Sequence, residues 1–153
     1  MMKQGLPQTL SVPGHLLMAV LLALLLPVWS MAAEPSLSRF EDGLMRERDS
    51  GLIWQMERSR KMRTPAAVQH YLHQLNQGKY RDWRLPTKWE LYDLFAKFDL
   101  KKNGDIAIAL EGSYWLRDED GSIHPGEWET GDQCGPERIM YPTKSGYVRA
   151  VRP

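Results

Sequence analysis

The segment from Asp82 to Leu91 (DWRLPTKWEL) constrains the fold more than any other part of this sequence. Its first half is extended in character and stops at Pro86, because proline disfavours a helical conformation in the residue before it. Thr87 and Glu90 then have the spacing of a capping box, in which each side chain bonds the backbone of the other residue. The segment therefore predicts an extended stretch that ends where a helix begins.

Two tryptophans and an arginine crowd this junction, more than a surface turn requires. We interpret Arg84 as a structural guanidinium that bonds carbonyls or a carboxylate and stacks on a tryptophan. Tryptophans in such runs are core residues more often than sugar-binding platforms. The residues expected to have structural roles are Trp54, Trp83, Arg84, Leu85, Pro86, Thr87, Glu90, Trp115 and Arg149.

The first 32 residues have the layout of a secretory signal. One lysine, Lys3, precedes the aliphatic run Leu16–Val28, and the small residues Ser30 and Ala32 follow it. The run is shorter than the roughly 18–20 residues that a spanning helix needs, which favours a cleaved signal over a retained anchor. We expect export to the periplasm or the cell exterior, with membrane contact only through an uncleaved signal.

Residues 33–39 are interpreted as a short leader and residues 40–153 as one domain, long enough for a single core. The chain has 20 Lys+Arg and 19 Asp+Glu, so its charge does not point to nucleic acid. Cys134 is the one cysteine and cannot form an internal disulfide. We expect a buried or inert thiol there, rather than a nucleophile or an intermolecular bridge.

Two segments have helical periodicity. Thr64 and Pro65 predict the start of the first helix, Gly78 its end, and Thr87 the start of the second. Their apolar stripes are Val68, Tyr71, Leu72 and Leu75, and Leu91, Leu94, Phe95 and Phe98. His70 and His73 could share a metal, but without an acidic partner on that helix we expect surface histidines.

Strand-like runs flank the helices. Residues 43–48 and 52–56 predict a hairpin around Asp49-Ser50-Gly51. Residues 113–117, 138–141 and 147–152 predict later strands, the last with Arg149 on the face opposite Val148 and Ala150. Strands at both ends and helices in the middle favour an α+β fold in which the first and last strands pair.

Two regions are candidates for ligand binding. The loop from Glu57 to Arg63, called the basic loop below, is either a solvated loop or an anion-binding patch. Its four cations are Arg58, Arg60, Lys61 and Arg63. Trp128 lies in the Gly- and Glu-rich segment 126–132, which we predict to be a loop. A tryptophan exposed there would be a platform for a ligand.

The sequence predicts neither a catalytic constellation nor a metal site. Asp118, Glu119 and Asp120 resemble half of a calcium-binding loop, but Pro125 and Gly126 interrupt the pattern, so we expect a solvated turn. No nucleophile elbow, phosphate loop or zinc motif appears. We therefore expect a non-enzymatic protein without a cofactor.

Several sequence words, in order, resemble the Lcl C-terminal domain family. They are GLIWQ (51–55), DWRLPTKWEL (82–91), YW (114–115) and YVRAVR (147–152). That family is similar to the formylglycine-generating-enzyme-like branch of C-type-lectin-like folds, which carries an RLPT…WE element. The resemblance implies two helices packed on short, mainly antiparallel strands with a long irregular loop region. It also implies bacterial secretion or surface display and, in adhesin members, binding to sulfated glycans.

The chain also departs from those relatives. Many of them have a cysteine in the first helix and another in the last strand, where this chain has Leu72 and Ala150. The resemblance implies that apolar packing replaces that cross-link. Formylglycine generation uses a pair of active-site cysteines, and the iron-dependent relatives use a histidine-rich triad. One cysteine and the histidines His70, His73 and His124 match neither site.

The leading hypothesis is an exported, non-enzymatic domain that binds a ligand, with a glycan as the first candidate, through its late loops. The alternative is a cell-envelope protein that acts through protein contacts. A third hypothesis is a degenerate relative of the formylglycine enzymes with residual redox or metal chemistry. The expected partners are therefore a glycan or an envelope protein.

Overall fold

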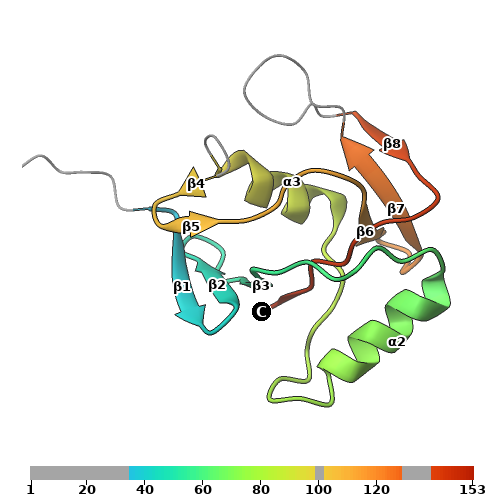
Figure 1. The fold of residues 1–153 in the computed structure, drawn as a ribbon, viewed down its shortest axis with the longest axis horizontal. Helices are drawn as coiled ribbons and strands as arrows, with labels where there is room; N and C mark the ends of the chain where they lie inside the picture. Colours follow the sequence, from blue (N-terminus) through green and yellow to red (C-terminus); the bar gives the residue numbers. More distant parts are fainter. Residues whose placement is uncertain (1–34, 99–101, 129–138) are drawn as a thin grey trace, which may run out of the picture. The chain divides into compact units, whose positions relative to one another are not determined.

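The computed structural model describes residues 35–98, 102–128 and 139–153, which form an α+β domain of short antiparallel strands and two helices (Figure 1). The predicted signal and Cys134 lie outside the described residues. None of the helices within the described ranges is long and apolar enough to cross a membrane.

The main sheet contains β1 (Leu37–Glu41), β2 (Leu44–Glu47), β3 (Ile53–Gln55) and β9 (Val151–Arg152), in that order. The predicted hairpin is confirmed, because β2 pairs antiparallel with β3 around a turn in which Gly51 has a φ of +74°. That conformation suits glycine, which has no Cβ to clash.

Two expectations about this sheet are wrong. The chain terminus pairs with β3, not with the first strand. The segment 33–39 is not simply a leader, because β1 begins at Leu37. The Leu37 side chain is buried in the hydrophobic core. Leu37 is paired with Glu47 of β2, so the first strand of the domain starts before Phe40. A lone leucine among polar residues carries no periodicity that would have revealed this.

Two smaller sheets follow the helices. β4 (Lys102–Asn103) and β5 (Ile106–Ala107) form a hairpin whose turn contains Gly104, with a φ of +59°. β6 (Tyr114–Arg117), β7 (Ile123–Trp128) and β8 (Met140–Pro142) form an antiparallel sheet in that order. The segment 126–128 is therefore strand, not the loop that its glycine and glutamate content predicted.

Both helices begin where the sequence predicts. Thr64 Oγ1 accepts the Ala67 N–H at the start of α2 (Pro65–Leu75), and Thr87 and Glu90 form the capping box of α3 (Lys88–Ala96). Helix α2 ends at Leu75, before the predicted Gly78. The Asn76 side chain at this end bonds the backbone N–H and C=O of Trp83, at 2.8 and 2.9 Å.

The two helices contribute to different cores. Trp54 and Val151 on one face of the main sheet pack with Leu91, Leu94 and Phe95 of α3. Ile53, next to Trp54 in β3, belongs instead to the core that contains Val68 of α2, together with Trp83, Leu85 and Trp115. Leu72 and Ala150 lie in this second core. Alternation along β3 thus supplies one residue to each core.

The segment Gly146–Arg152, called the C-terminal segment below, crosses between these cores. Val148 and Ala150 belong to the α2 core and Val151 to the α3 core, so the predicted alternation is confirmed. Only Val151–Arg152 forms a strand, because the earlier residues bond separate parts of the chain. Tyr147, for example, pairs with Ser113 and Trp115, at 2.8 Å for each bond.

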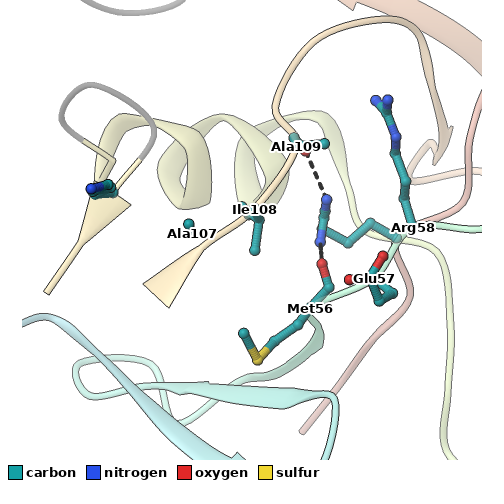
Figure 2. Close-up of a pocket in the computed structure, with 8 residues that line it drawn as sticks. Met56, Glu57, Arg58, Ala107, Ile108 and Ala109 are labelled. Atoms are coloured by element: carbon teal, nitrogen blue, oxygen red, sulfur yellow. Dashed lines mark hydrogen bonds between the residues drawn. The ribbon is translucent and has the colours of Figure 1, made fainter. Parts of the chain in front are cut away.

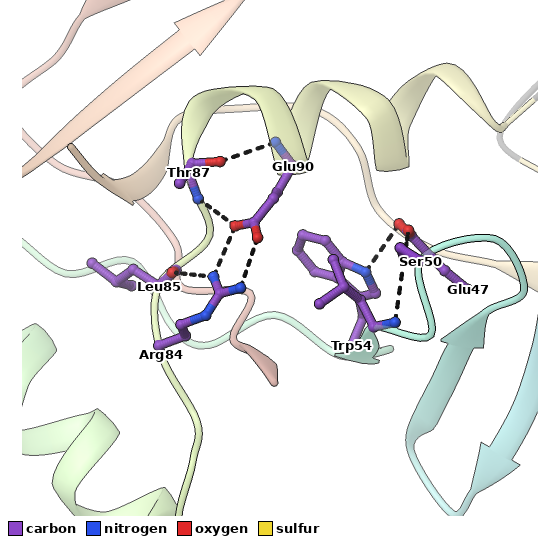
Figure 3. A network of polar contacts seen from close by, with 8 residues as sticks. Glu47, Ser50, Trp54, Arg84, Leu85, Thr87 and Glu90 are labelled. Carbon is purple, nitrogen blue, oxygen red and sulfur yellow. Dashed lines mark hydrogen bonds and ion pairs between the residues drawn. The ribbon is translucent and has the colours of Figure 1, made fainter. Parts of the chain in front are cut away.

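Arg84 joins the C-terminal segment to the start of α3. Figure 3 shows its contact with Glu90 at the start of that helix. Its backbone exchanges two hydrogen bonds with Val151, at 2.9 and 3.0 Å. Its guanidinium donates to both carboxylate oxygens of Glu90, at 2.8 and 2.6 Å, and Glu90 also accepts the Thr87 N–H. Within the described residues its recorded partners are oxygens, not the tryptophan ring that we expected.

The Glu90 carboxylate is stabilised in its charged form. Burial by itself would raise its pKa, but hydrogen bonds from Arg84 and from the Thr87 backbone bring the pKa below its usual value. A carboxylate whose pKa falls on folding contributes stability above its unfolded pKa and loses that contribution as the pH falls through the folded pKa.

We predict that Arg84→Ala lowers stability without altering the ligand surface described below. The substitution leaves Glu90 half-buried without its guanidinium partner, which costs about 2 kcal/mol. For a domain of this size the melting temperature falls by roughly 6–10 °C. Thermal unfolding followed by circular dichroism measures the change.

Glu90→Gln is the control for the ionic part of this contact. Its melting temperature should lie below that of the natural protein at pH 7. The difference should shrink as the pH falls below the ordinary glutamate pKa of about 4.3 and through the lowered pKa of Glu90. A difference that stays constant down to pH 3 would show that the charge of Glu90 does not contribute.

Candidate functional site

The basic loop connects β3 to α2 and separates its four cations into two groups. The Arg58 guanidinium lies 3.8 Å from the centre of the Tyr147 ring and donates to the Tyr114 hydroxyl at 3.2 Å and to the Glu111 carbonyl. The other three, Arg60, Lys61 and Arg63, are exposed. Arg58 is therefore part of the scaffold, and the other three form the surface.

The C-terminal segment holds the backbone of this loop. Met62 and Gly146 exchange hydrogen bonds of 2.8 and 2.9 Å, and the Trp115 indole donates to the Met62 carbonyl at 3.2 Å. Met62 is buried. Because neighbouring side chains alternate along an extended backbone, the burial of Met62 directs Lys61 and Arg63 outward.

Ser59 adds a second attachment to the same segment. Its N–H donates to the Val148 carbonyl at 2.8 Å, and its hydroxyl accepts the Val148 N–H at 2.8 Å. The cations of the loop thus stand on a backbone that is fixed on both sides of Arg60. A ligand would not have to order this backbone on binding, which removes an entropic cost.

A hollow of about 450 Å³ lies between the basic loop and α2. Ser59, Arg60 and Met62 line it on the side of the loop, and Ala67, His70, Tyr71 and Gln74 on the side of the helix. The Tyr71 hydroxyl is held by the Gln55 side chain at 3.1 Å, which fixes its ring in the wall. The hollow is therefore mainly apolar, and its lining also includes one cationic side chain and several polar groups.

Trp128 does not belong to this surface, and its predicted role as an exposed platform is wrong. It is the last residue of β7, and only 6% of its surface is exposed. Its ring packs against Phe95 and Tyr92 of α3, with ring centres 5.8 and 6.0 Å apart. The glycan hypothesis must therefore rest on the basic loop without an aromatic platform from β7.

Trp89 is an exposed aromatic residue that the sequence analysis did not single out as a site. It is 55% exposed on α3, meets Tyr92 edge to face at 5.9 Å, and has the Lys88 ammonium 4.9 Å from its ring. The helical period would have predicted its exposure. Trp89 lies two residues from the buried Leu91, which places the two side chains about 200° apart around the helix, on opposite faces.

The acidic turn at Asp118–Ser122 uses its carboxylates internally. Asp118 accepts from the Ser122 hydroxyl and contacts His124 Nδ1 at 3.0 Å, and Asp120 accepts the Ser122 N–H at 2.9 Å. That backbone bond, with the Ser122 side chain, lowers the pKa of Asp120. Across the described ranges, no group of three or more His, Cys, Asp or Glu side chains is placed to hold a metal ion.

Comparison with known proteins adds no relative. No family model matches the chain, and no match is found among curated proteins or solved structures. The resemblance to the Lcl C-terminal domain family therefore rests on the sequence words alone.

We predict that Trp128→Ala destabilises the fold instead of selectively removing ligand binding. Removing a buried indole between two aromatic rings costs about 3–5 kcal/mol. Urea denaturation should show this loss, and Trp128→Phe should lose clearly less because it retains a ring in the cavity. Full stability of Trp128→Ala together with lost binding would restore Trp128 as a ligand platform.

Proposed function

We propose that this chain is an exported, non-enzymatic domain that binds anionic glycans, in particular sulfated ones, through the basic loop. One observation carries the proposal. Arg60, Lys61 and Arg63 project from a backbone fixed at Ser59 and Met62, and none of them has a carboxylate partner among the described residues. Exposed cations of one sign that remain unneutralised attract polyanions.

Lys144 adds to the same positive region. It is exposed and lies two residues before Gly146, which is bonded to Met62 of the basic loop. The Met62–Gly146 contact thus brings a fourth exposed cation, Lys144, which is far away in sequence, to the vicinity of the loop. Several exposed cations on one surface region fit a chain that carries repeated sulfate groups better than they fit a single small anion.

The hollow beside α2 supplies an apolar surface for the sugar ring, which the exposed cations do not provide. Its volume of about 450 Å³ is within the range of small-molecule pockets. Its apolar and aromatic walls, at Met62, Ala67 and Tyr71, suit the carbon face of a sugar ring, while His70 and Gln74 offer hydrogen-bonding groups. We assign a sugar ring to this hollow and its neighbouring sulfate groups to Arg60 and Arg63.

The family assignment and the export of the protein are part of the same proposal. We propose a divergent Lcl C-terminal-type domain with a C-type-lectin-like arrangement, delivered by the predicted signal at residues 1–32. The support is the order of GLIWQ, DWRLPTKWEL, YW and YVRAVR along the chain. Support also comes from the contacts among these words, since Trp54, Arg84 and Val151 meet in the structure.

A second function, protein contact in the cell envelope, is favoured by Trp89. An indole that is 55% exposed beside Tyr92 is a residue type that often dominates the energy of protein interfaces. The two functions use different residues, so variants can separate them.

We predict that the triple variant Arg60→Gln, Lys61→Gln, Arg63→Gln binds heparin, a sulfated glycan, about 10- to 100-fold more weakly than the natural protein. The estimate takes up to about 1 kcal/mol for each exposed charge contact. Heparin binding of the natural protein should also weaken as salt rises, because salt screens exposed charges. Titration calorimetry at two salt concentrations measures both effects.

The matched control replaces three other exposed cations, Arg39, Arg46 and Arg81, with glutamine, which removes the same net charge. The control should retain at least a third of the affinity, and so should Trp89→Ala. Equal losses in the two triple variants would reduce the effect to net charge and contradict a specific site. No binding of heparin by the natural protein would leave the protein-contact function, with Trp89→Ala as its test.

A further inference from the structure

A second cavity, of about 630 Å³, lies where the start of the basic loop meets the region of β4 and β5 (Figure 2). Met56, Glu57 and Arg58 line it on the side of the loop, and Lys102, Ile108 and Arg149 contribute from later parts of the chain. It shares no lining residue with the hollow beside α2. Its function is therefore a separate question from glycan binding at the basic loop.

Arg149 is the most unusual residue of this cavity, because its cation is buried without an ion pair. It is 1% exposed, and its guanidinium donates to the backbone carbonyls of Gln55, Met56 and Ala109. Among the described residues it forms no ion pair, and its Nε has no hydrogen-bond partner. Burial lowers the pKa of Arg149, because desolvation disfavours its charged form.

The rest of the lining neutralises this charge only in part, because the Glu57 carboxylate favours the charged form of Arg149 while Arg58 disfavours it. Arg58 adds a second cation, held in place by Tyr147 and Tyr114. Its positive charge repels that of Arg149. Lys102 adds a third, and the one carboxylate in the lining, Glu57, is exposed. A cavity lined by three cations and one acid has a net positive charge, which attracts an anion.

The apolar part of the lining limits the kind of anion. Met56, Ile108, Ala107 and Ala109 are carbon surfaces beside the cationic groups. A bare inorganic ion would leave these surfaces in water, whereas a molecule with a carbon body would cover them. The volume is that of a pocket for a small organic molecule.

We propose that this cavity binds a small organic anion, a molecule about the size of a monosaccharide that carries one carboxylate or phosphate group. The combined positive charge of Arg58, Arg149 and Lys102 attracts the oxyanion, and the carbon body covers Met56 and Ile108. The carboxylate and the phosphate share this chemistry, so the experiment must separate them.

The test is a titration of the purified protein, followed by amide resonances in two-dimensional NMR spectra, with D-glucuronate, with D-glucose 6-phosphate and with D-glucose. At least one of the two anions should give saturable shifts at residues 56–58, 108–109 and 149, and the anion that does so identifies the group. Neutral glucose should give none at the same concentration. Shifts with glucose equal to those with the anions, or no saturable shift at these residues, would overturn the proposal.

Substitutions at two exposed lining residues of opposite charge test the proposal without disturbing the hydrophobic core. Glu57→Gln removes the acid and should tighten anion binding about 2- to 5-fold, while Lys102→Gln should weaken it by a similar factor. Arg60→Gln, outside this cavity, should leave the affinity unchanged. Changes in the same direction for the first two variants would contradict an electrostatic site.

The outcomes are independent of those expected for the basic loop. The variant with Arg60, Lys61 and Arg63 replaced should lose heparin and keep the small anion, whereas Lys102→Gln should keep heparin. If the triple variant loses the small anion too, the anion binds on the loop surface and the assignment to this cavity is wrong.

Discussion

The hydrogen bonding of the C-terminal segment is the constraint on which the rest of this structure depends. Val151 is paired with Trp54 on one side and exchanges two hydrogen bonds with Arg84 on the other. Further back, Gly146 is bonded to Met62 and Tyr147 to Ser113 and Trp115. A buried backbone must satisfy its N–H and C=O groups, and this segment does so by joining four parts of the chain that are distant in sequence.

The same segment explains why the two candidate sites lie where they do. Its backbone holds Ser59 and Met62, and so fixes the basic loop with its exposed cations directed outward. Its side chains alternate, so that Val148 and Ala150 enter the α2 core while Arg149 faces the other way. Arg149 thereby brings a buried positive charge to the wall of the larger cavity. One extended segment thus positions both surfaces that could attract an anion.

Features that depend on neighbours in the sequence could be predicted well. The capping residues Thr64 and Thr87, the hairpin around Gly51 and the apolar stripe of α3 all follow from local spacing and are present. Arg84 was expected to bond a carboxylate, and the capping-box residue Glu90 is that partner. Short-range rules succeed here because the interacting residues are at most eleven positions apart in the sequence.

Features that depend on distant partners could not be predicted in the same way. The composition around Trp128 indicates a loop, yet pairing with β6 and β8 makes it a strand and α3 covers the indole. Arg58 could not be separated from Arg60 and Lys61, because the separation comes from Tyr114 and Tyr147, which lie more than 50 residues away in the chain.

By itself, the sequence determined the mixed α+β character, the positions where the helices begin, and the grouping of four cations in one loop. Local propensity and hydrophobic periodicity are sufficient for each of these, since they require no knowledge of packing partners. Only the tertiary structure decided which of those cations are exposed, that Trp128 is buried, and that Arg149 stands beside a cavity without an ion pair. Exposure and electrostatic environment are set by long-range packing, which a linear pattern does not specify.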